Sequence, residues 1–336
     1  MKIKIIFVSF MVMCMLTACI KDDTYNDINT VLQTNDIGNL KEGLVSADNE
    51  YLYFFHGTTG KIYKMNIETG KITFLCDNPT CTHTSDCPSM NKSFLQTDDN
   101  HLFALGNYEV ENGSDIVYSS FGEIKDGEYI KILEKNTGLL LPTITNGRLL
   151  CCIDNKITLI DLNTKKTLKE FKYDYALSLL ELYCVDDTIY FVNGLGILNS
   201  IGIESGKKQQ LTDTKVCQTL VCGEYIYYID DKNSLFRMKK DKTTELITEN
   251  CQTLNILNDT LYVSYTVDVG VYTMDLDGKN KIRIFDKDSI INIYLFEQQN
   301  IMVCSNYEKC YIGKLDGTEM IEPKVPETID YDIKTY

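Results

Sequence analysis

The chain has 336 residues, and 44% of them are hydrophobic, which is ample for a folded core. Its 48 acidic residues outnumber 33 basic ones, so the formal net charge is −15. A surface of this charge repels phosphate backbones and anionic lipid headgroups, which argues against a nucleic-acid partner.

The N-terminal residues have the layout of a secretory signal. Two lysines precede an apolar stretch at 5–16 that is too short for a stable membrane span. The order Leu-Thr-Ala-Cys at 16–19 resembles the lipobox of bacterial lipoproteins. The resemblance implies cleavage after Ala18, diacylation of Cys19 and a lipid-anchored protein on the extracytoplasmic side of the cell membrane. An ordinary signal peptide cut after Ala18 is the alternative.

These features divide the chain into four predicted segments. Residues 1–18 are the lipoprotein signal peptide, and residues 19–43 carry the lipid anchor and a polar linker. A repeated strand pattern occupies residues 44–323. Residues 324–336 form a C-terminal tail or a closing strand.

The pattern is a turn of Asp, Asn or Gly that leads into a short run of aromatic and aliphatic residues. A second strand, a charged hairpin turn and usually a third strand follow. The third position of each apolar run recurs every 35 to 50 residues, at Tyr53, Phe103, Leu150, Tyr190, Tyr227, Tyr262 and Met302.

Strand units at this period predict an all-β fold, a β-propeller. The nearly continuous apolar runs indicate strands that neighbouring blades cover on both faces. Seven copies predict seven blades, and six or eight remain open because the second copy is long and irregular. We expect a strand from one terminus to close the ring, with residues 28–33 and 328–336 as candidates.

Two motifs resemble known families. The aromatic pair and acid at Tyr227, Tyr228 and Asp230 resemble the Tyr-Trp-Thr-Asp propellers of lipoprotein-receptor type. Together with the lipobox and the Cys-Asp-x-Pro-x-Cys-x-His-x3-Cys-Pro segment at 76–88, this resembles a lipoprotein family of Gram-positive bacteria with receptor-like propellers. The resemblance implies the propeller fold and the surface location, and it implies no activity.

The same segment carries the candidate metal ligands Cys76, Cys81, His83 and Cys87. Three thiolates and an imidazole close a tetrahedral zinc site completely, and closed sites are structural. A disulfide among the three cysteines is equally natural in a secreted chain. Structural zinc, a disulfide and unlinked thiols therefore stay open. In each linked form we expect the side chains to converge between the first two blades and to brace a long loop.

A second cysteine pair lies near the C-terminus. Cys304 and Cys310 flank the five-residue loop of a predicted hairpin, where they could be cross-strand neighbours close enough to form a disulfide.

The sequence predicts no catalytic residues. It lacks a Gly-x-Ser-x-Gly elbow, a glycine-rich phosphate loop and a His-Glu-x-x-His pair. We therefore favour a cell-surface lipoprotein whose propeller binds an extracytoplasmic peptide, glycan or partner protein. A cell-envelope lyase or hydrolase with a site assembled on a propeller face is one alternative. A structural component of an envelope complex is another.

Overall fold

The computed structural model describes most of the chain after the linker. The described residues are 38–39, 43–56, 61–76, 78, 80–81, 87–90, 92–109, 117–135, 139–172, 181–287, 289–306 and 309–325. Within them, no helix is long and apolar enough to cross a membrane. The predicted signal peptide, Cys19 and both candidate closing strands lie outside the described residues.

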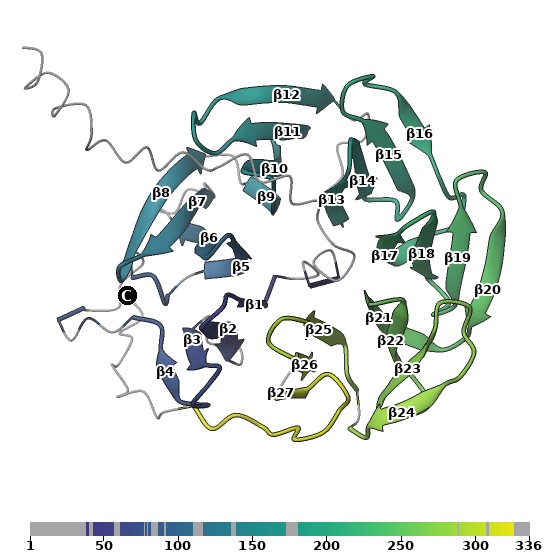
Figure 1. The fold of residues 1–336 in the computed structure, drawn as a ribbon. Helices are drawn as coiled ribbons and strands as arrows, with labels where there is room; N and C mark the ends of the chain where they lie inside the picture. The colour runs from purple at the N-terminus through teal and green to yellow at the C-terminus, as the bar shows by residue number, and fades with distance from the viewer. Residues whose placement is uncertain are drawn as a thin grey trace, which may run out of the picture.

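The described part is a ring of seven antiparallel sheets, which confirms the predicted seven-bladed β-propeller (Figure 1). Blades 1 to 3 contain β1 (Val45–Ala47), β2 (Tyr51–His56), β3 (Lys61–Asn66), β4 (Ile72–Phe74); β5 (Lys92–Asp98), β6 (His101–Glu109), β7 (Val117–Lys125), β8 (Glu128–Lys135); and β9 (Leu139–Thr145), β10 (Arg148–Ile153), β11 (Lys156–Asp161), β12 (Thr167–Lys172). Blades 4 and 5 contain β13 (Glu181–Val185), β14 (Thr188–Val192), β15 (Leu198–Gly202), β16 (Lys208–Gln210); and β17 (Val216–Cys222), β18 (Tyr225–Asp230), β19 (Leu235–Lys239), β20 (Thr244–Thr248). Blades 6 and 7 contain β21 (Cys251–Leu257), β22 (Thr260–Tyr265), β23 (Val271–Asp275), β24 (Ile282–Phe285); and β25 (Asn292–Phe296), β26 (Ile301–Ser305), β27 (Cys310–Lys314).

Strands within each blade pair in chain order, so each blade is a meander that runs outward from the axis. The turn residues explain this local folding. Both residues of the turns Asp99–Asn100 and Asn258–Asp259 have positive φ, as a type I′ hairpin turn requires, and Asn and Asp tolerate that conformation. The long spacing of the second repeat comes partly from its strands, because β6 and β7 have nine residues each.

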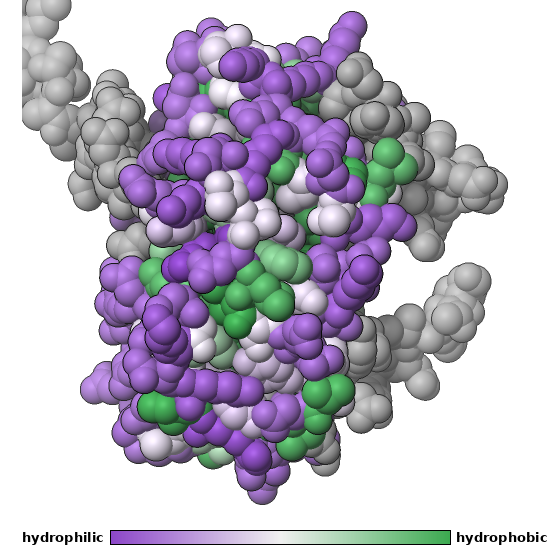
Figure 2. All heavy atoms as spheres, turned by 90° about the vertical axis from the view of Figure 1, so that its right-hand side faces the viewer, coloured by the Kyte–Doolittle hydropathy of each residue, from purple (hydrophilic) through white to green (hydrophobic). Residues whose placement is uncertain are grey.

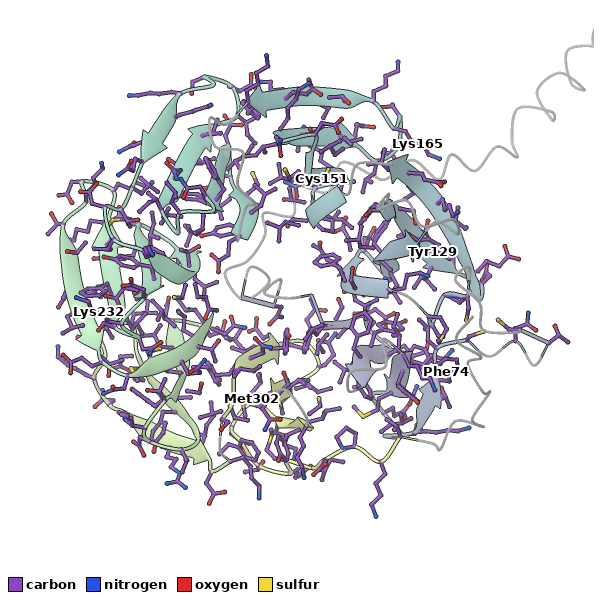
Figure 3. The ribbon with its side chains drawn as sticks, turned by 180° about the vertical axis from the view of Figure 1, so that it is seen from behind. Phe74, Tyr129, Cys151, Lys165, Lys232 and Met302 are labelled. Atoms are coloured by element: carbon purple, nitrogen blue, oxygen red, sulfur yellow. The ribbon has the colours of Figure 1, made fainter. Side chains whose placement is uncertain are left out.

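The core lies between blades, because each sheet buries its faces against its two neighbours. Phe103 and Phe121 of blade 2, for example, pack with Leu149 of blade 3. Cys151 and Met302 are fully buried inside the ring wall (Figure 3). The apolar runs of the repeat therefore form interfaces between blades, as strands covered on both faces require.

Polar side chains join the innermost strands of neighbouring blades from β1 to β25. Gln96 of β5 donates from Nε2 to the carbonyl of Ile144 in β9 (2.9 Å) and accepts from the Ile144 N–H (2.7 Å). Gln218 makes the same pair of bonds with Leu254 (2.8 and 3.1 Å). In the described part, further side chain–backbone bonds join β1 to β5, β9 to β13, β13 to β17 and β21 to β25: Ser46–Thr97, Thr143–Leu182, Glu181–Thr219 and Asn255–Ile293.

Packing closes the ring between the first and last blades. Leu52 and Phe54 of blade 1 share a buried cluster with Tyr294 and Val303 of blade 7. Blade 7 gains a short fourth partner when Ile321 forms an isolated antiparallel bridge with Ile312 of β27. Among the described residues, no sheet combines strands from the two ends of the chain. The predicted strand exchange concerns residues 28–33 and 328–336, which lie outside the described part.

Residues just before β1 reinforce this closure. We call Gly38–Asn39 and Gly43–Leu44 the entry segment. Asn39 bonds both the N–H and the carbonyl of Leu295 in β25 (2.8 and 2.7 Å) and accepts a bond from Asn255 in β21 (2.9 Å). A Cβ on Gly38 would lie 1.9 Å from the Asn255 side chain, and one on Gly43 would lie 2.1 Å from the ring of Phe94. The entry segment thus contacts blades at both sides of the seam.

The alternating strand directions define two faces of the propeller. The connections between blades, and the loops between the second and third strands, lie at one end of the strands, which we call the connection face. The hairpin turns between first and second strands, and between third and fourth strands, lie at the opposite end. The three-cysteine segment joins blade 1 to blade 2 and therefore belongs to the connection face.

Candidate metal centre

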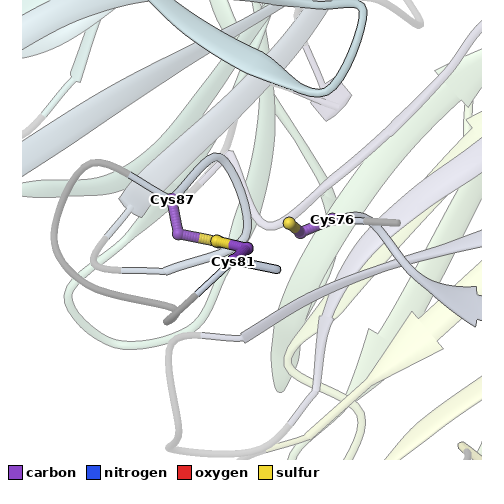
Figure 4. A group of neighbouring side chains, drawn as sticks. All are labelled: Cys76, Cys81 and Cys87. Carbon is purple, nitrogen blue, oxygen red and sulfur yellow. The ribbon is translucent and has the colours of Figure 1, made fainter. Parts of the chain in front are cut away.

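Three of the four predicted ligands converge between blades 1 and 2. Cys76 follows β4, and Cys87 precedes β5. Both cysteines are buried, whereas Cys81 is half-buried. The three Sγ atoms all lie within 4.8 Å of one another (Figure 4). In the described part of the chain, none of the three takes part in a disulfide.

Ser89 holds Cys76 and Cys87 together. Its side chain is fully buried, and its Oγ accepts a hydrogen bond from the Cys76 N–H (2.5 Å). Its carbonyl accepts a bond from the N–H of Ile62 in β3 (3.1 Å). Because Ser89 is two residues after Cys87, these bonds fix the Cys87 turn against the edge of blade 1.

A separate turn positions Cys81. The N–H of Cys81 donates to the carbonyl of Asn78 (3.1 Å), and the Asn78 side chain accepts bonds from the N–H and hydroxyl of Thr80 (3.0 and 2.8 Å). Asn commonly forms such turns with the backbone two residues on. The turn brings Cys81 back toward Cys76, which precedes it by five positions in the chain.

A buried lysine completes the surroundings. Lys92 is only 4% exposed, and its Nζ donates to the carbonyls of Cys87 (3.1 Å) and Met90 (2.8 Å). The same Nζ lies 4.4 Å from the ring centroid of Tyr129 on blade 2, a cation–π contact. Lys92 therefore links the cysteine turn of the connection to the sheet that follows it.

Two of the three thiols, those of Cys76 and Cys87, are weaker acids than an ordinary cysteine. Burial raises the pKa of Cys87 to about 12 and also raises that of Cys76. Backbone hydrogen bonds from Ser89 to Cys87 and from Asn78 to Cys76 oppose part of this shift. A cation that compensates the buried negative charge would therefore make these two thiols easier to deprotonate.

Of the other predicted site residues, the structure describes Cys304 and Cys310 but not His83 and Cys19. His83 and Cys19 lie outside the described residues, so the roles proposed for them stay predictions. Cys304 and Cys310 are free thiols. In the register of β26 and β27, Cys304 lies opposite Tyr311 and Cys310 lies opposite Ser305.

This register does not favour a disulfide between them. Directly opposite residues share a sheet face, and a one-residue offset changes the face. Cys304 packs into the core between blades 6 and 7, whereas Cys310 packs against the cluster between blades 1 and 7. A bond between the two would require the strands to shift.

Comparison with known proteins identifies the fold and no family. The sequence matches no family model and no curated protein. The chain is similar in structure to BamB from Moraxella catarrhalis, with a TM-score of 0.52, 12% identity and 80% of each chain covered. It is also similar to the computationally designed Ika8 protein, with a TM-score of 0.54, 12% identity, and 83% of this chain and 86% of that one covered.

A third similar structure is PorZ, an essential bacterial surface component of the type-IX secretion system of Porphyromonas gingivalis. Its TM-score is 0.59 at 11% identity, and the alignment covers 86% of this chain but 39% of PorZ. At these identities the similarity shows the propeller fold alone.

Proposed function

We propose that this protein is a lipid-anchored, extracytoplasmic propeller that binds a partner protein on its connection face. The carrying observation is the uneven placement of exposed apolar side chains. Among the described residues, Leu195, Val267 and Val269 are exposed on loops of the connection face, at 45%, 73% and 42%. The other exposed large hydrophobics lie on outer strands or, for Ile321, beside β27. On the opposite face, the described turns between first and second strands and between third and fourth strands expose none.

The loop at 266–270 presents its valines from a fixed support. Tyr272 donates its hydroxyl to Asp268 (2.7 Å). The Lys281 Nζ lies 3.8 Å from the ring centroid of Tyr265 and 4.3 Å from that of Tyr272. A preformed loop loses little conformational entropy when a partner docks, so these contacts favour binding.

The outer rim is a weaker candidate for docking. The side of the ring that carries β16, β19 and β20 is mainly hydrophilic, with a hydrophobic area near the middle of the view and smaller ones toward its edges (Figure 2). Leu246 and Ile282 are exposed on the outer strands β20 and β24. Isolated apolar side chains of this kind are usual on soluble surfaces.

The proposal also includes the lipid anchor on Cys19 and a link among the cysteines at 76–87. Surface components such as PorZ share the fold, which is compatible with an extracytoplasmic place for this chain. A lipid on Cys19 would hold the propeller at the membrane. Structural zinc on Cys76, Cys81, His83 and Cys87, or a disulfide among the cysteines, would stiffen the connection between blades 1 and 2 on the proposed binding face.

Two experiments test the proposal. Radiolabelled palmitate should enter the wild-type protein and not Cys19→Ala, which should stay uncut or appear in the medium.

For binding, the protein is cross-linked in its own envelope and the captured partners are identified by mass spectrometry. The double variant Val267→Asp, Val269→Asp should lose the partner that the wild type captures. Leu168→Asp, at a similarly exposed position on outer strand β12, is the control and should retain it. Equal capture by all three proteins would disprove docking on this face.

A further inference from the structure

We propose that Cys76, Cys81 and Cys87 supply three of the four ligands of one Zn²⁺ ion. The inference is independent of the partner that the connection face binds. Soft thiolate ligands favour Zn²⁺ over hard cations such as Mg²⁺ and Ca²⁺. Each thiol gives up its proton to solvent when its sulfur bonds the metal.

The spacing of the sulfurs fits such an ion without rearrangement of the loop. Three atoms no more than 4.8 Å apart always share a point about 2.8 Å or less from each, which is 4.8 divided by √3. Zinc–sulfur bonds are about 2.3 Å long. Small rotations of the three side chains therefore suffice to place the ion.

The number of converging sulfurs favours a metal over a disulfide. A disulfide uses two thiols and leaves the third without a role, whereas Cys81 is turned toward both others by its own Asn78 turn. Ser89 fixes Cys76 and Cys87 through its side chain and its backbone. A site held in this way before the ion arrives loses little entropy on binding.

The charge at the site is also suitable for Zn²⁺. Three thiolates around a divalent ion carry one net negative charge. The buried ammonium of Lys92 donates to the carbonyl oxygen of Cys87 (3.1 Å), which places a positive charge beside one of the ligand residues. A buried anionic cluster without a nearby cation would be costly to desolvate.

The test uses the full-length protein purified without chelators or metal-affinity resin. Elemental analysis should find one zinc per chain, and the reduced apoprotein should take up one Zn²⁺ in competition with a chromophoric chelator. Cys81→Ser, at the half-buried position, should fold and weaken zinc affinity by more than about 100-fold. Loss of an outer-shell partner typically costs about 10–100-fold, so Ser89→Ala should weaken affinity about tenfold. Cys217→Ser removes an exposed thiol on β17 and should leave affinity unchanged.

A second readout reports on the connection itself. Zinc removal should speed proteolysis within residues 75–91, while the strands of blades 4 and 5 stay protected, because blades contact only their neighbours. Far-ultraviolet circular dichroism checks that each variant is folded. The proposal is overturned if the reduced wild-type protein binds no zinc. It is equally overturned if the mass of the native protein is lower by two hydrogen atoms and a disulfide is mapped between two of these cysteines.

Discussion

Lys92 shows how a single side chain can join the candidate site to the fold. Lysine is rarely buried, yet Lys92 lies under the cysteine turn with its Nζ between two carbonyls and the Tyr129 ring. Carbonyl oxygens that lose a buried donor pay a desolvation penalty. The side chain therefore supports the turn whether or not an ion is bound.

Replacing this lysine should destabilise the protein. Lys92→Met keeps most of the side-chain volume and removes the donor from the carbonyls of Cys87 and Met90. We expect the free energy of unfolding to fall by about 1–3 kcal/mol, measured by urea denaturation. Lys232→Met changes an exposed lysine and should shift it by less than about 0.5 kcal/mol. Equal values for both variants would show that Lys92 carries no structural role.

The sequence predicted part of this site and missed its support. The spacing of Cys76, Cys81 and Cys87 was enough to predict that their side chains meet, because short turns with proline leave few paths between them. Nothing in the pattern marked Ser89 or Lys92. A serine and a lysine in a polar loop read as exposed residues, and their burial depends on how blades 1 and 2 pack.

At the scale of strands, the contacts between innermost strands matter most. Gln96 and Gln218 each pair with a backbone N–H and carbonyl of the next blade, as a neighbouring strand would. These backbone groups are buried and need partners. The two glutamines thus supply hydrogen-bond partners for backbone groups in the innermost strands of blades 3 and 6.

Truncating one of these amides should weaken one junction between blades. Gln96→Ala leaves the buried N–H and carbonyl of Ile144 without this partner, and we expect a loss of about 2 kcal/mol in the free energy of unfolding. Gln209→Ala on exposed strand β16 is the control, with a change below about 0.5 kcal/mol. Thermal or urea denaturation measures both. A Gln96→Ala protein as stable as the control would refute the importance of the bond.

Local sequence specified the strands but not these junctions. Turns such as Asp99–Asn100 could be recognised because Asn and Asp favour positive φ, and the apolar runs marked the covered strands. The glutamines pair with residues 48 and 36 positions away. Polar residues inside apolar runs give no sign of which distant backbone they will meet.

At the scale of the whole molecule, the ring closes through side-chain packing and through the entry segment. Asn39 contacts Leu295, which is 256 residues away in the chain. This asparagine does for blade 7 what Gln96 and Gln218 do for other blades. The sequence predicted a polar linker at residues 19–43 and gave no sign of this contact. Nothing distinguishes Asn39 from the many other polar residues in that segment.

Asn39→Ala should loosen the ring locally. The change removes both bonds to Leu295 and the bond from Asn255. We expect amide hydrogen exchange to speed up in β21 and β25, while β9 and β13, on the far side of the ring, remain as protected as in the wild type. Exchange measured by mass spectrometry on peptides from these strands gives the comparison. Uniform acceleration in every blade would instead indicate global destabilisation.

The buried thiols make stability sensitive to alkaline pH. Burial, together with the nearby Asp187 carboxylate, raises the pKa of the Cys184 thiol from its ordinary 9.0 to about 12. The unfolded chain therefore loses this proton at lower pH than the folded chain. The thiol's contribution to stability is complete below about pH 9 and is lost as the pH rises toward 12.

Cys184→Ala should reduce this alkaline loss. We expect the free energy of unfolding of the variant to fall less steeply between about pH 9 and pH 11 than that of the wild type, whatever its value at pH 7. Cys217→Ala, which changes an exposed thiol, should keep the wild-type slope. Denaturant unfolding at several pH values measures the slopes. Parallel curves for the two variants would contradict the expectation.

The entry segment also decides where mechanical load would reach the protein. Asn39 bonds to the innermost strands of blades 6 and 7, so tension applied to the residues before Gly38 would act first on these bonds. The hydrogen-bond ladders within the blades lie behind these contacts and would be loaded only after they break. Under force, the contacts of the entry segment would therefore break while each sheet was still intact.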